Sequence, residues 1–208
     1  MSTLAQAEFE EQLKQAIENP LAYFDRPIPL SGTPAGVLVL FGVSPGEVPK
    51  VLLTQRTDTV EKHKGQIAFP GGMLDPEDVE HGGLVATALR ETEEEVGISR
   101  ELVRVHGILP DFPTTTGFVV TPVLSTLKQP PEQVLMTLNS FEIADTFWVS
   151  LEELKRPGVY STEIYEARGK QYPIHVFNVE AGGERRIWGA TGAILKNILD
   201  RLEAVVSK

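Results

Sequence analysis

The sequence predicts an α/β domain in which a mixed sheet lies between helices. Short apolar runs with strand character are interspersed with amphipathic helical segments, without the regular alternation of a parallel βαβ array. The chain has 208 residues, a length that suits one large domain better than two small ones. We therefore expect a single domain over residues 1–208, with an N-terminal helix and connector in 1–34 and a core in 35–206.

The first elements follow from local patterns. Apolar residues recur near helical spacing over residues 3–18, and Pro20 lies just past them, which predicts a helix. The prolines and glycine of residues 20–34 predict an irregular connector. AGVLVLFGV (35–43) reads as a buried strand, and VLLTQRT (51–57) as a second strand that forms a hairpin with it.

The rest of the chain continues the alternation of sheet and helix. Residues 58–76 are rich in glycine and proline and predict loops. A helix is expected over 84–96, because Gly97 is a typical stop signal. Further strands are predicted at 102–109, 117–126, 132–138, 145–149, 159–166 and 172–179, and further helices at 151–155 and 189–206.

Composition excludes several classes of function. Asp plus Glu number 29 against 19 Lys plus Arg, so the net charge is −10. This charge repels nucleic-acid polymers and anionic membranes, so neither is expected as a partner, and a phosphate-bearing substrate would need a local cation. Cysteine is absent, which excludes disulfides, thiolate nucleophiles and cysteine-bound metals. The acidic start and the short longest apolar run, 35–43, predict a soluble cytoplasmic protein without a signal peptide.

Three glutamates carry the strongest chemical signal. Glu91, Glu94 and Glu95 are spaced i, i+3 and i+4 in the predicted helix, which places their carboxylates on one face, whereas Glu93 points elsewhere. Like charges at this spacing cost about 0.2–0.5 kcal/mol per pair. A hard cation such as Mg²⁺ or Mn²⁺ reverses that cost, because it prefers carboxylate, water and phosphate oxygens.

A solvated acidic helix face is the alternative explanation of the same run. It would be favoured for three glutamates alone. The apolar residues Leu89, Val96 and Ile98 indicate that this helix packs on a core, and a Gly-Gly turn precedes it. The whole spacing R-E-x-x-E-E-x-G-I therefore favours a metal-binding helix.

The segment from Arg90 to Ile98 resembles the second half of the Nudix box, G-x5-E-x7-R-E-U-x-E-E-x-G-U. Thr92 stands where the box has an apolar residue. In the first half, Gly72 is followed by Asp78 in place of Glu, and four extra residues separate Gly72 from Arg90. We place these extra residues around positions 80–83. Asp78 is expected to cap the helix, unless Glu80 takes its place.

A second resemblance is to the coenzyme A pyrophosphatases within the Nudix superfamily. Their motif before the box is L-L-T-x-R-S-x3-R-x3-G-x3-F-P-G-G, and residues 52–72 are similar to it. Thr57 replaces the motif's Ser, and Glu61 stands where that subfamily has Arg. Residues 111–124 and 186–195 also resemble this subfamily. The matching residues of the motif are Leu52, Leu53, Thr54, Arg56, Gly65, Phe69, Pro70, Gly71 and Gly72.

The resemblance implies a Nudix-type α/β/α sandwich whose catalytic core hydrolyses the pyrophosphate bond of coenzyme A or its derivatives. Glu91 and Glu95 are the implied ligands of Mg²⁺ or Mn²⁺, with Glu94 as a further ligand or as the general base. Arg90 is expected to orient a carboxylate. Glu142 is a candidate for a remote base or ligand, as are Asp145 and Asp111, and for each an ordinary surface acid is an equal alternative.

The candidate substrate-binding residues lie beside the glycine turn. Arg56 is in the matching motif, and His63 and Lys64 follow in a basic stretch with Lys62. Gly71 and Gly72 complete the set. Trp188 and Phe118 are expected in the core or lining a pocket, with adenine stacking as a lesser alternative.

Two other functions stay open. A Nudix hydrolase of ADP-ribose or NADH is the second enzymatic reading, and Glu61 is the reason for it. A non-catalytic nucleotide sensor is the third, disfavoured by the complete set of clustered acids. In each case the expected partner is a small-molecule nucleotide. Two roles are open for the N-terminal 30 residues: covering the sheet, or joining a homodimer.

Overall fold

The computed structural model describes residues 4–18, 31–58, 65–167 and 169–207. Most of the expected connector at 20–34 lies outside these ranges, as do Glu61, Lys62, His63 and Lys64. No helix in the described ranges is long and apolar enough to cross a membrane.

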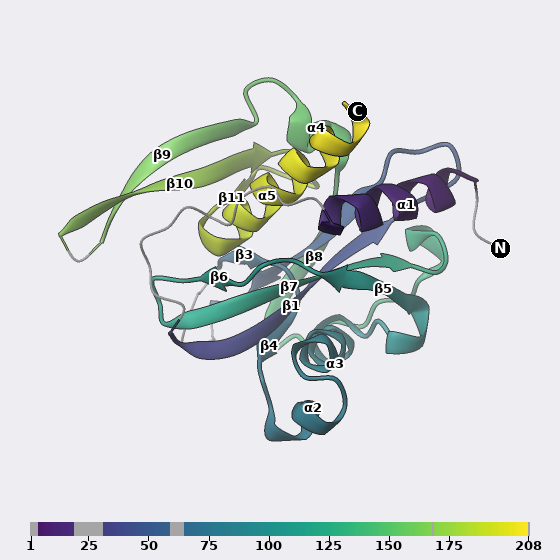
Figure 1. Ribbon diagram of the computed structural model, residues 1–208, viewed down its shortest axis with the longest axis horizontal. Coiled ribbons are helices and arrows are strands. Elements are labelled where there is room, and N and C mark those ends of the chain that lie inside the picture. The colour runs from purple at the N-terminus through teal and green to yellow at the C-terminus, as the bar shows by residue number, and fades with distance from the viewer. Residues whose placement is uncertain (1–3, 19–30, 59–64, 168, 208) are drawn as a thin grey trace.

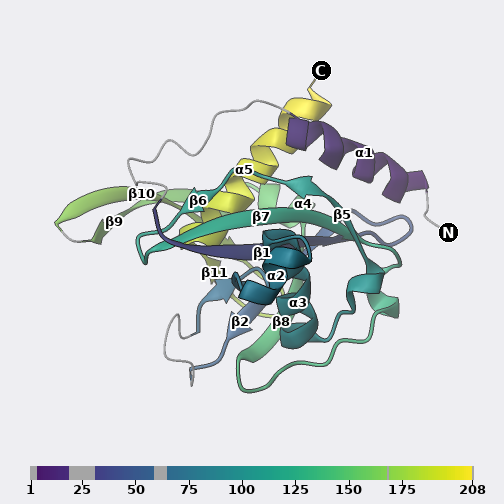
Figure 2. The same cartoon turned by 60° about the horizontal axis from the view of Figure 1, so that its bottom comes forward.

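The protein has three layers, with helices on both faces of a mixed sheet (Figure 1). Helices α1 (Leu4–Glu18) and α5 (Gly189–Val206) cover one face. Helices α2 (Pro76–Glu80) and α3 (Leu84–Val96) cover the other, and Figure 2 shows both in front of the sheet. The short α4 (Leu151–Lys155) follows the last strand of the main sheet. The predicted α/β architecture is therefore confirmed.

The main sheet is built around β1 (Thr33–Gly42), which pairs with β7 in parallel and with β2 and β4 in antiparallel orientation. The predicted hairpin of β1 and β2 exists only at its closed end, where Phe41 faces Val51, because β2 continues along β8. The strand order is β3-β2-β1-β7-β5, with β4, β6 and β8 paired to β1, β7 and β2. The other strands are β2 (Lys50–Arg56), β3 (Ile67–Ala68), β4 (Gly71–Met73), β5 (Val103–Ile108), β6 (Phe112–Pro113), β7 (Phe118–Leu127) and β8 (Ile143–Ser150).

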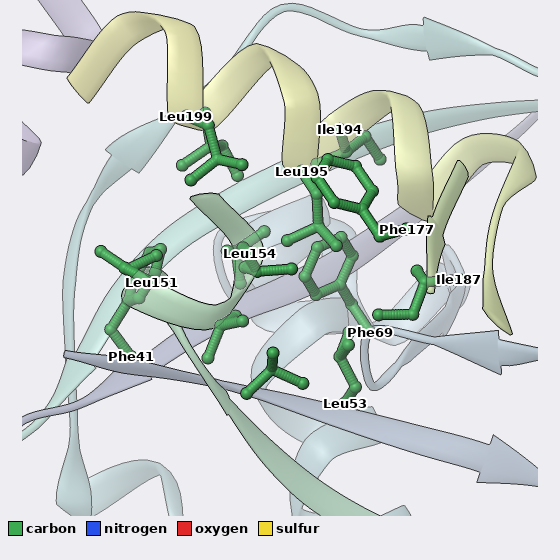
Figure 3. Close-up of a cluster of buried hydrophobic side chains, with 14 of the residues drawn as sticks. Phe41, Leu53, Phe69, Leu151, Leu154, Phe177, Ile187, Ile194, Leu195 and Leu199 are labelled. Atoms are coloured by element: carbon green, nitrogen blue, oxygen red, sulfur yellow. The ribbon is translucent and has the colours of Figure 1, made fainter. Parts of the chain in front are cut away.

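Burial on both faces explains the uninterrupted apolar run of β1. Successive side chains point to opposite faces of a strand. Val39 and Phe41 belong to the core beneath α1 and α5, whereas Leu38 and Leu40 belong to the core beneath α3. The first core is drawn in Figure 3, where side chains of α5 meet those of both sheets; it includes Phe41, Leu53, Phe69, Phe177, Ile187, Ile194, Leu195 and Leu199.

A second, antiparallel sheet lies beside α5. It consists of β9 (Tyr160–Ala167), β10 (Lys170–Val179) and β11 (Arg185–Ile187). The β9–β10 hairpin extends away from the main body, at the left of Figure 1. Arg185 connects the two sheets: its guanidinium donates hydrogen bonds to Gln55 of β2 and Asp145 of β8 and lies 4.8 Å from the ring centroid of Phe147.

The N-terminal helix covers the sheet, which is one of the two roles left open for the N-terminal 30 residues. Phe9, Leu13 and Ala16 are buried in the core that α1 shares with α5. The buried carboxylate of Glu10 accepts a hydrogen bond from Arg104 at the sheet edge over 2.6 Å. The helix is thus anchored by both apolar packing and an ion pair.

The predicted strand at 132–138 is wrong. Its start is the single turn η2 (Pro131–Gln133), and the following residues are irregular. Val134, Met136 and Leu138 do pack on the core beneath α3, so the period of two is real. The backbone amides of Thr137 and Asn139, however, bond to the carbonyls of Val96 and Glu95 at the end of α3. The segment therefore caps the C-terminal end of α3, where the last carbonyls have no partner within the helix.

Short elements were not predicted because two or three residues carry no periodic signal. These are β3, β4, β6 and β11 and the single-turn helices η1 (Arg100–Leu102) and η2. The five-residue helix α2, which lies in the segment expected to form loops and the start of the box, was not predicted either. The longer elements agree with the prediction in type and closely in bounds. The end of α3 follows the expected rule: Gly97 adopts a left-handed conformation with φ of 72°, and its amide bonds to the carbonyl of Glu93.

Candidate active site

The acidic face of α3 is divided between β4 and solvent. The Gly71 amide of β4 donates a hydrogen bond to Oε2 of Glu95 over 3.2 Å. The Glu91 carboxylate lies so close to Gly72 that a Cβ there would collide with it. Glu94 is on the outer side of the face, with 57% of its side chain exposed. Glu93 points away and pairs with Arg100, as the spacing predicted.

Glu95 is the most strongly perturbed carboxyl of the site. It is 3% exposed, and burial raises its pKa to about 8. The Gly71 hydrogen bond and the positive charge of Arg56 oppose the rise in pKa, and the charges of Glu91 and Glu142 add to it. Arg56 supplies a cation beside it, with Nη1 at 3.5 Å from Oε1 of Glu95. The buried carboxylate of Glu95 is therefore stabilised when it binds a proton or a metal cation.

Glu91 shares this environment. Burial raises its pKa, the charge and hydrogen bond of Arg90 lower it, and the charges of Glu94 and Glu142 raise it again. Four carboxylates thus influence one another around the inner half of α3. Such a concentration of negative charge is stabilised by a positive ion of oxygen-seeking type.

Arg90 holds carboxylates on both of its sides. Its Nη1 lies 3.1 Å from Glu91 and 3.0 Å from Glu94. On the other side, Nε and Nη2 donate to the two oxygens of Asp78 over 3.2 and 3.0 Å. The Asp78 hydrogen bond is the main reason that the pKa of Arg90 is raised, so the guanidinium stays charged. These contacts fit the expected orienting role.

Asp78 caps a helix, but a different one from the helix expected. It is the third residue of α2, where it forms a reciprocal capping box with Asp75. Helix α3 begins at Leu84, and its N-cap residue Gly83 provides no side-chain cap. Asp78 is buried and also accepts a hydrogen bond from Thr87 of α3 over 2.8 Å, so it ties α2 to α3. Glu80 is exposed at the end of α2 and does not take this place.

The donor chemistry of the site fits a divalent cation. Glu91 and Glu95 supply hard oxygen donors, and the negative charge of Glu142 acts on both of them. Within the described ranges, no three acidic or histidine side chains are already gathered as a metal-binding group. Arg90 contacts Glu91 and Glu94, whereas Glu95 contacts Arg56 and Gly71, so the three expected ligands are not assembled on one point.

The other acidic candidates differ in position. Glu142 precedes β8, and its charge acts on both Glu91 and Glu95, which places it at the site. Asp145 is engaged by Arg185 between the two sheets. Asp111 accepts a hydrogen bond from Thr121 over 2.5 Å. The structure therefore brings only Glu142 of these three next to the glutamates of α3.

A pocket of about 320 Å³ opens beside Glu95. Gly71 and Arg56 line it with Glu95, so two expected substrate-binding residues reach it. The Nε of Arg56 is buried and has no hydrogen-bond partner within the described part of the chain. Gly72 contacts Glu91 instead of the pocket, and His63 and Lys64 lie outside the described residues.

Aromatic residues form much of the pocket wall. Trp188 and Phe118 line it, in agreement with one of the two roles expected for them. Sequence reasoning missed Tyr165 and Tyr172, which lie opposite each other in the β9–β10 pair, and the threonines of residues 114–116. The T-T-T run within 111–124 was a signal that could have led to the threonines.

Comparisons with known proteins agree with this geometry. A sequence profile of the NUDIX domain matches residues 32–168. The chain is 35% identical over 155 residues to the uncharacterized Nudix hydrolase NudL of Photorhabdus laumondii, covering 74% of this chain and 78% of that protein. It is 37% identical over 150 residues to the uncharacterized Nudix hydrolase NudL of Citrobacter koseri, covering 72% of this chain and 73% of that protein.

A solved structure shows the same fold. The MutT/nudix family protein from Enterococcus faecalis matches 98% of this chain and 76% of its own with a TM-score of 0.51, at 19% identity. The expected Nudix-type arrangement of helices around a mixed sheet is therefore confirmed. The profile match and the NudL relatives together show that this chain belongs to the Nudix hydrolase family, enzymes that act on pyrophosphate bonds of nucleoside diphosphate derivatives.

Proposed function

We propose that the protein hydrolyses the pyrophosphate bond of coenzyme A or its derivatives. Water attacks one phosphorus of the P–O–P bridge, and the bond from that phosphorus to the bridging oxygen breaks, so that the bridging oxygen leaves on the other phosphate. The products are adenosine 3′,5′-bisphosphate and 4′-phosphopantetheine. The observation that supports this proposal most is that two separate segments of the chain are in contact at Glu95. The segment that resembles the coenzyme A pyrophosphatase motif supplies Arg56 and Gly71, and the Nudix-box helix supplies the carboxylate.

Nudix hydrolases use divalent metal ions. Glu91 and Glu95 would hold Mg²⁺ or Mn²⁺ in this protein, with Glu94 as a further ligand. When bound, the ion neutralises phosphate charge and makes water a stronger nucleophile. The shared burial and negative charge of Glu91 and Glu95 support their role, because both carboxylates are more acidic beside a cation.

The general base is either Glu94 or Glu142. Glu142 acts electrostatically on both inner glutamates, which supports it as the proton acceptor. Glu94 is exposed and held by Arg90, which supports a role at the outer edge of the site. Arg90 is a positioning residue: it contacts Asp78, and its Nη1 lies close to the carboxylates of both Glu91 and Glu94. A comparison of the pH–rate profiles of Glu94→Gln and Glu142→Gln distinguishes the two bases, because only the base variant loses the acidic limb.

Substrate phosphates would be held by Arg56, with His63 and Lys64 of the adjoining basic stretch and the Gly71–Gly72 turn. The Nε of Arg56 beside the pocket is buried and has no hydrogen-bond partner among the described residues, which supports this role. The pocket draws residues from β1 through to α5, which supports our proposal that 35–206 form one catalytic core.

A substrate screen tests the proposal. Purified protein is incubated with coenzyme A, 3′-dephospho-coenzyme A, ADP-ribose or NADH, each with Mg²⁺ or Mn²⁺, and products are separated by chromatography. We expect coenzyme A to be cleaved at least as well as the others, and a chelator to abolish the reaction. Hydrolysis of ADP-ribose or NADH without hydrolysis of coenzyme A would overturn the assignment.

ADP-ribose or NADH is a second candidate substrate, because the described part of the site offers few positive charges for a 3′-phosphate. Among the pocket-lining residues that the structure describes, Arg56 is the one cation. Glu61 also stands where the resembling subfamily has an Arg that suits a 3′-phosphate. A strong preference for the dephospho form that Glu61→Arg reverses would favour this candidate. For coenzyme A as substrate, Glu61→Arg is expected to change the KM only modestly.

A further inference from the structure

We infer that the pocket between the two sheets holds the uncharged pantetheine arm of coenzyme A, and that the adenine nucleotide with its 3′-phosphate lies outside the pocket. This inference rests on the proposed function and deepens it, because it assigns each half of the substrate to a place. It makes Tyr165, Tyr172 and Trp188 the residues that determine specificity for the arm.

The wall of the pocket is built by elements far from the Nudix-box helix. Tyr165 of β9 and Tyr172 of β10 are directly opposed in an antiparallel pair, so their side chains lie on the same face of the second sheet. Trp188, between β11 and α5, has its ring centroid 5.7 Å from that of Tyr165. All three rings line the pocket, and two of them lie beyond the residues that the NUDIX profile matches.

Size limits what the pocket can take. Its volume of about 320 Å³ is near the lower end of the ~300–1,000 Å³ range of small-molecule sites. A space of this size suits one half of a dinucleotide-like substrate. The pocket also reaches Glu95 and Gly71, so its occupant is joined to the diphosphate at the candidate active site.

The charge of the pocket wall indicates which half of coenzyme A binds in the pocket. Of the lining residues that the structure describes, only Arg56 and Glu95 are charged, and they lie 3.5 Å apart beside the diphosphate position. The remaining wall is aromatic and aliphatic, with hydroxyls of Thr114, Thr115 and Thr116. A 3′-phosphate placed there would be an unpaired charge in an apolar wall, which is strongly unfavourable. The pantetheine arm carries amides, a hydroxyl and methylene groups, and no charge.

Tryptophan fluorescence tests the assignment without catalysis. The chain has two tryptophans; Trp188 lines the pocket, whereas Trp148 packs against the core beneath α3. Pantetheine and AMP are titrated into the native protein and into Trp188→Phe. We expect pantetheine to change the fluorescence saturably in the native protein and not in Trp188→Phe, and AMP to leave it unchanged. A saturable response to AMP with none to pantetheine would overturn the inference.

Kinetics provides the matched comparison. Tyr165 is 40% exposed, and its neighbour Ile164 is 63% exposed on the opposite face of β9. Tyr165→Ala should raise the KM for coenzyme A about tenfold, equal to about 1.4 kcal/mol of binding, and leave kcat within about twofold. Ile164→Ala should leave the KM within about twofold.

The two proposals fail separately. Cleavage of coenzyme A with an unchanged KM in Tyr165→Ala would overturn the assignment of the pocket and leave the proposed function in place. Failure to cleave coenzyme A, with saturable pantetheine binding at Trp188, would overturn the proposed reaction and support the pocket assignment.

Discussion

The backbone amide of Gly71 donates a hydrogen bond to the carboxylate of Glu95 over 3.2 Å. This contact joins the glycine turn of β4 to the acidic face of α3. It satisfies one oxygen of a carboxylate that is 3% exposed, and Arg56 approaches the other from β2. The position of the most buried acid in the site therefore depends on a turn that lies 24 residues earlier in the chain.

Glu95→Gln should abolish most of the activity. The substitution keeps the size of the side chain and removes its charge, so the affinity for a divalent cation falls. We expect kcat to fall about 10³-fold, or about 4 kcal/mol of barrier, in buffer that contains saturating metal. Glu93→Gln is the matched control, because Glu93 is on the same helix and pairs with Arg100 away from the site. Full activity of Glu95→Gln would remove α3 from the mechanism.

The metal-free protein should become less stable as pH rises, because of Glu95. Its folded-state pKa of about 8 lies above the unfolded value of 4.5, so the folded state binds the proton more tightly. The resulting stabilisation is fully present below about pH 4.5 and is lost as pH rises to about 8. Thermal unfolding with a chelator at pH 5 and pH 9 measures this effect.

Glu95→Gln should remove that dependence. At pH 9 the metal-free variant should have a higher Tm than the native protein, and a gain of about 1 kcal/mol corresponds to about 2–4 °C at this chain length. At pH 5 the two proteins should unfold at similar temperatures. A markedly lower Tm of the variant at both pH values would mean that the carboxylate itself stabilises the fold.

Adjacent glycines should respond differently to alanine. At Gly71, φ is +154°, and a Cβ would collide with the backbone of Gly36 and Val37. Gly71→Ala should therefore lower the Tm clearly. At Gly72 the colliding group is the end of the Glu91 side chain, which can move. Gly72→Ala should keep a near-native Tm and lower kcat by displacing Glu91.

Circular dichroism melts and steady-state kinetics of both variants check this pair. Equal loss of stability in the two proteins would contradict the assignment of Gly72 to the space beside Glu91. Native kinetics in Gly72→Ala would show that the position of Glu91 is not critical.

Asp78→Asn should destabilise the protein more than a change of helix cap would. Asn caps helices as well as Asp does, so a purely capping residue would tolerate the change. Asp78 is buried, however, and accepts two hydrogen bonds from Arg90 and one from Thr87. Hydrogen bonds to charged groups contribute about 1.5–3 kcal/mol, so we expect a loss of about 2 kcal/mol.

Activity separates this role from metal binding. Asp78→Asn should lower kcat through Arg90, by much less than Glu95→Gln does, because its oxygens are already engaged by α2 and α3. Chemical denaturation and kinetics measured side by side decide the question. A loss of activity as large as that of Glu95→Gln, with unchanged stability, would make Asp78 a ligand.

Local patterns in the sequence were sufficient for much of the site. The i, i+3, i+4 spacing placed Glu91, Glu94 and Glu95 on α3, and Gly97 marked its end, because helix geometry depends on near neighbours. Thr92, which departs from the apolar position of the box, is fully buried and gives its hydroxyl to the carbonyl of Ala88 over 2.7 Å. Threonine can therefore occupy this buried position, because its hydroxyl donates a hydrogen bond to a carbonyl of its own helix.

The segment after residue 131 shows where local patterns fail. Alternation of Val134, Met136 and Leu138 correctly reports one buried side. It does not report whether the backbone bonds to a neighbouring strand or to the carbonyls at the end of a helix, as it does here. That choice depends on which groups from elsewhere in the chain lie alongside.

The sequence by itself determined the family, the layered fold class, the acidic helix and the arginine-bearing strand beside it, since each is encoded in a short run of residues. Only the tertiary structure decided that Glu95 is buried against Gly71 of β4, and that Tyr165, Tyr172 and Trp188 share one pocket with Glu95. These relationships join residues from separate elements. They are set by the packing of the second sheet and α5 on the first sheet, a long-range arrangement that no local periodicity records.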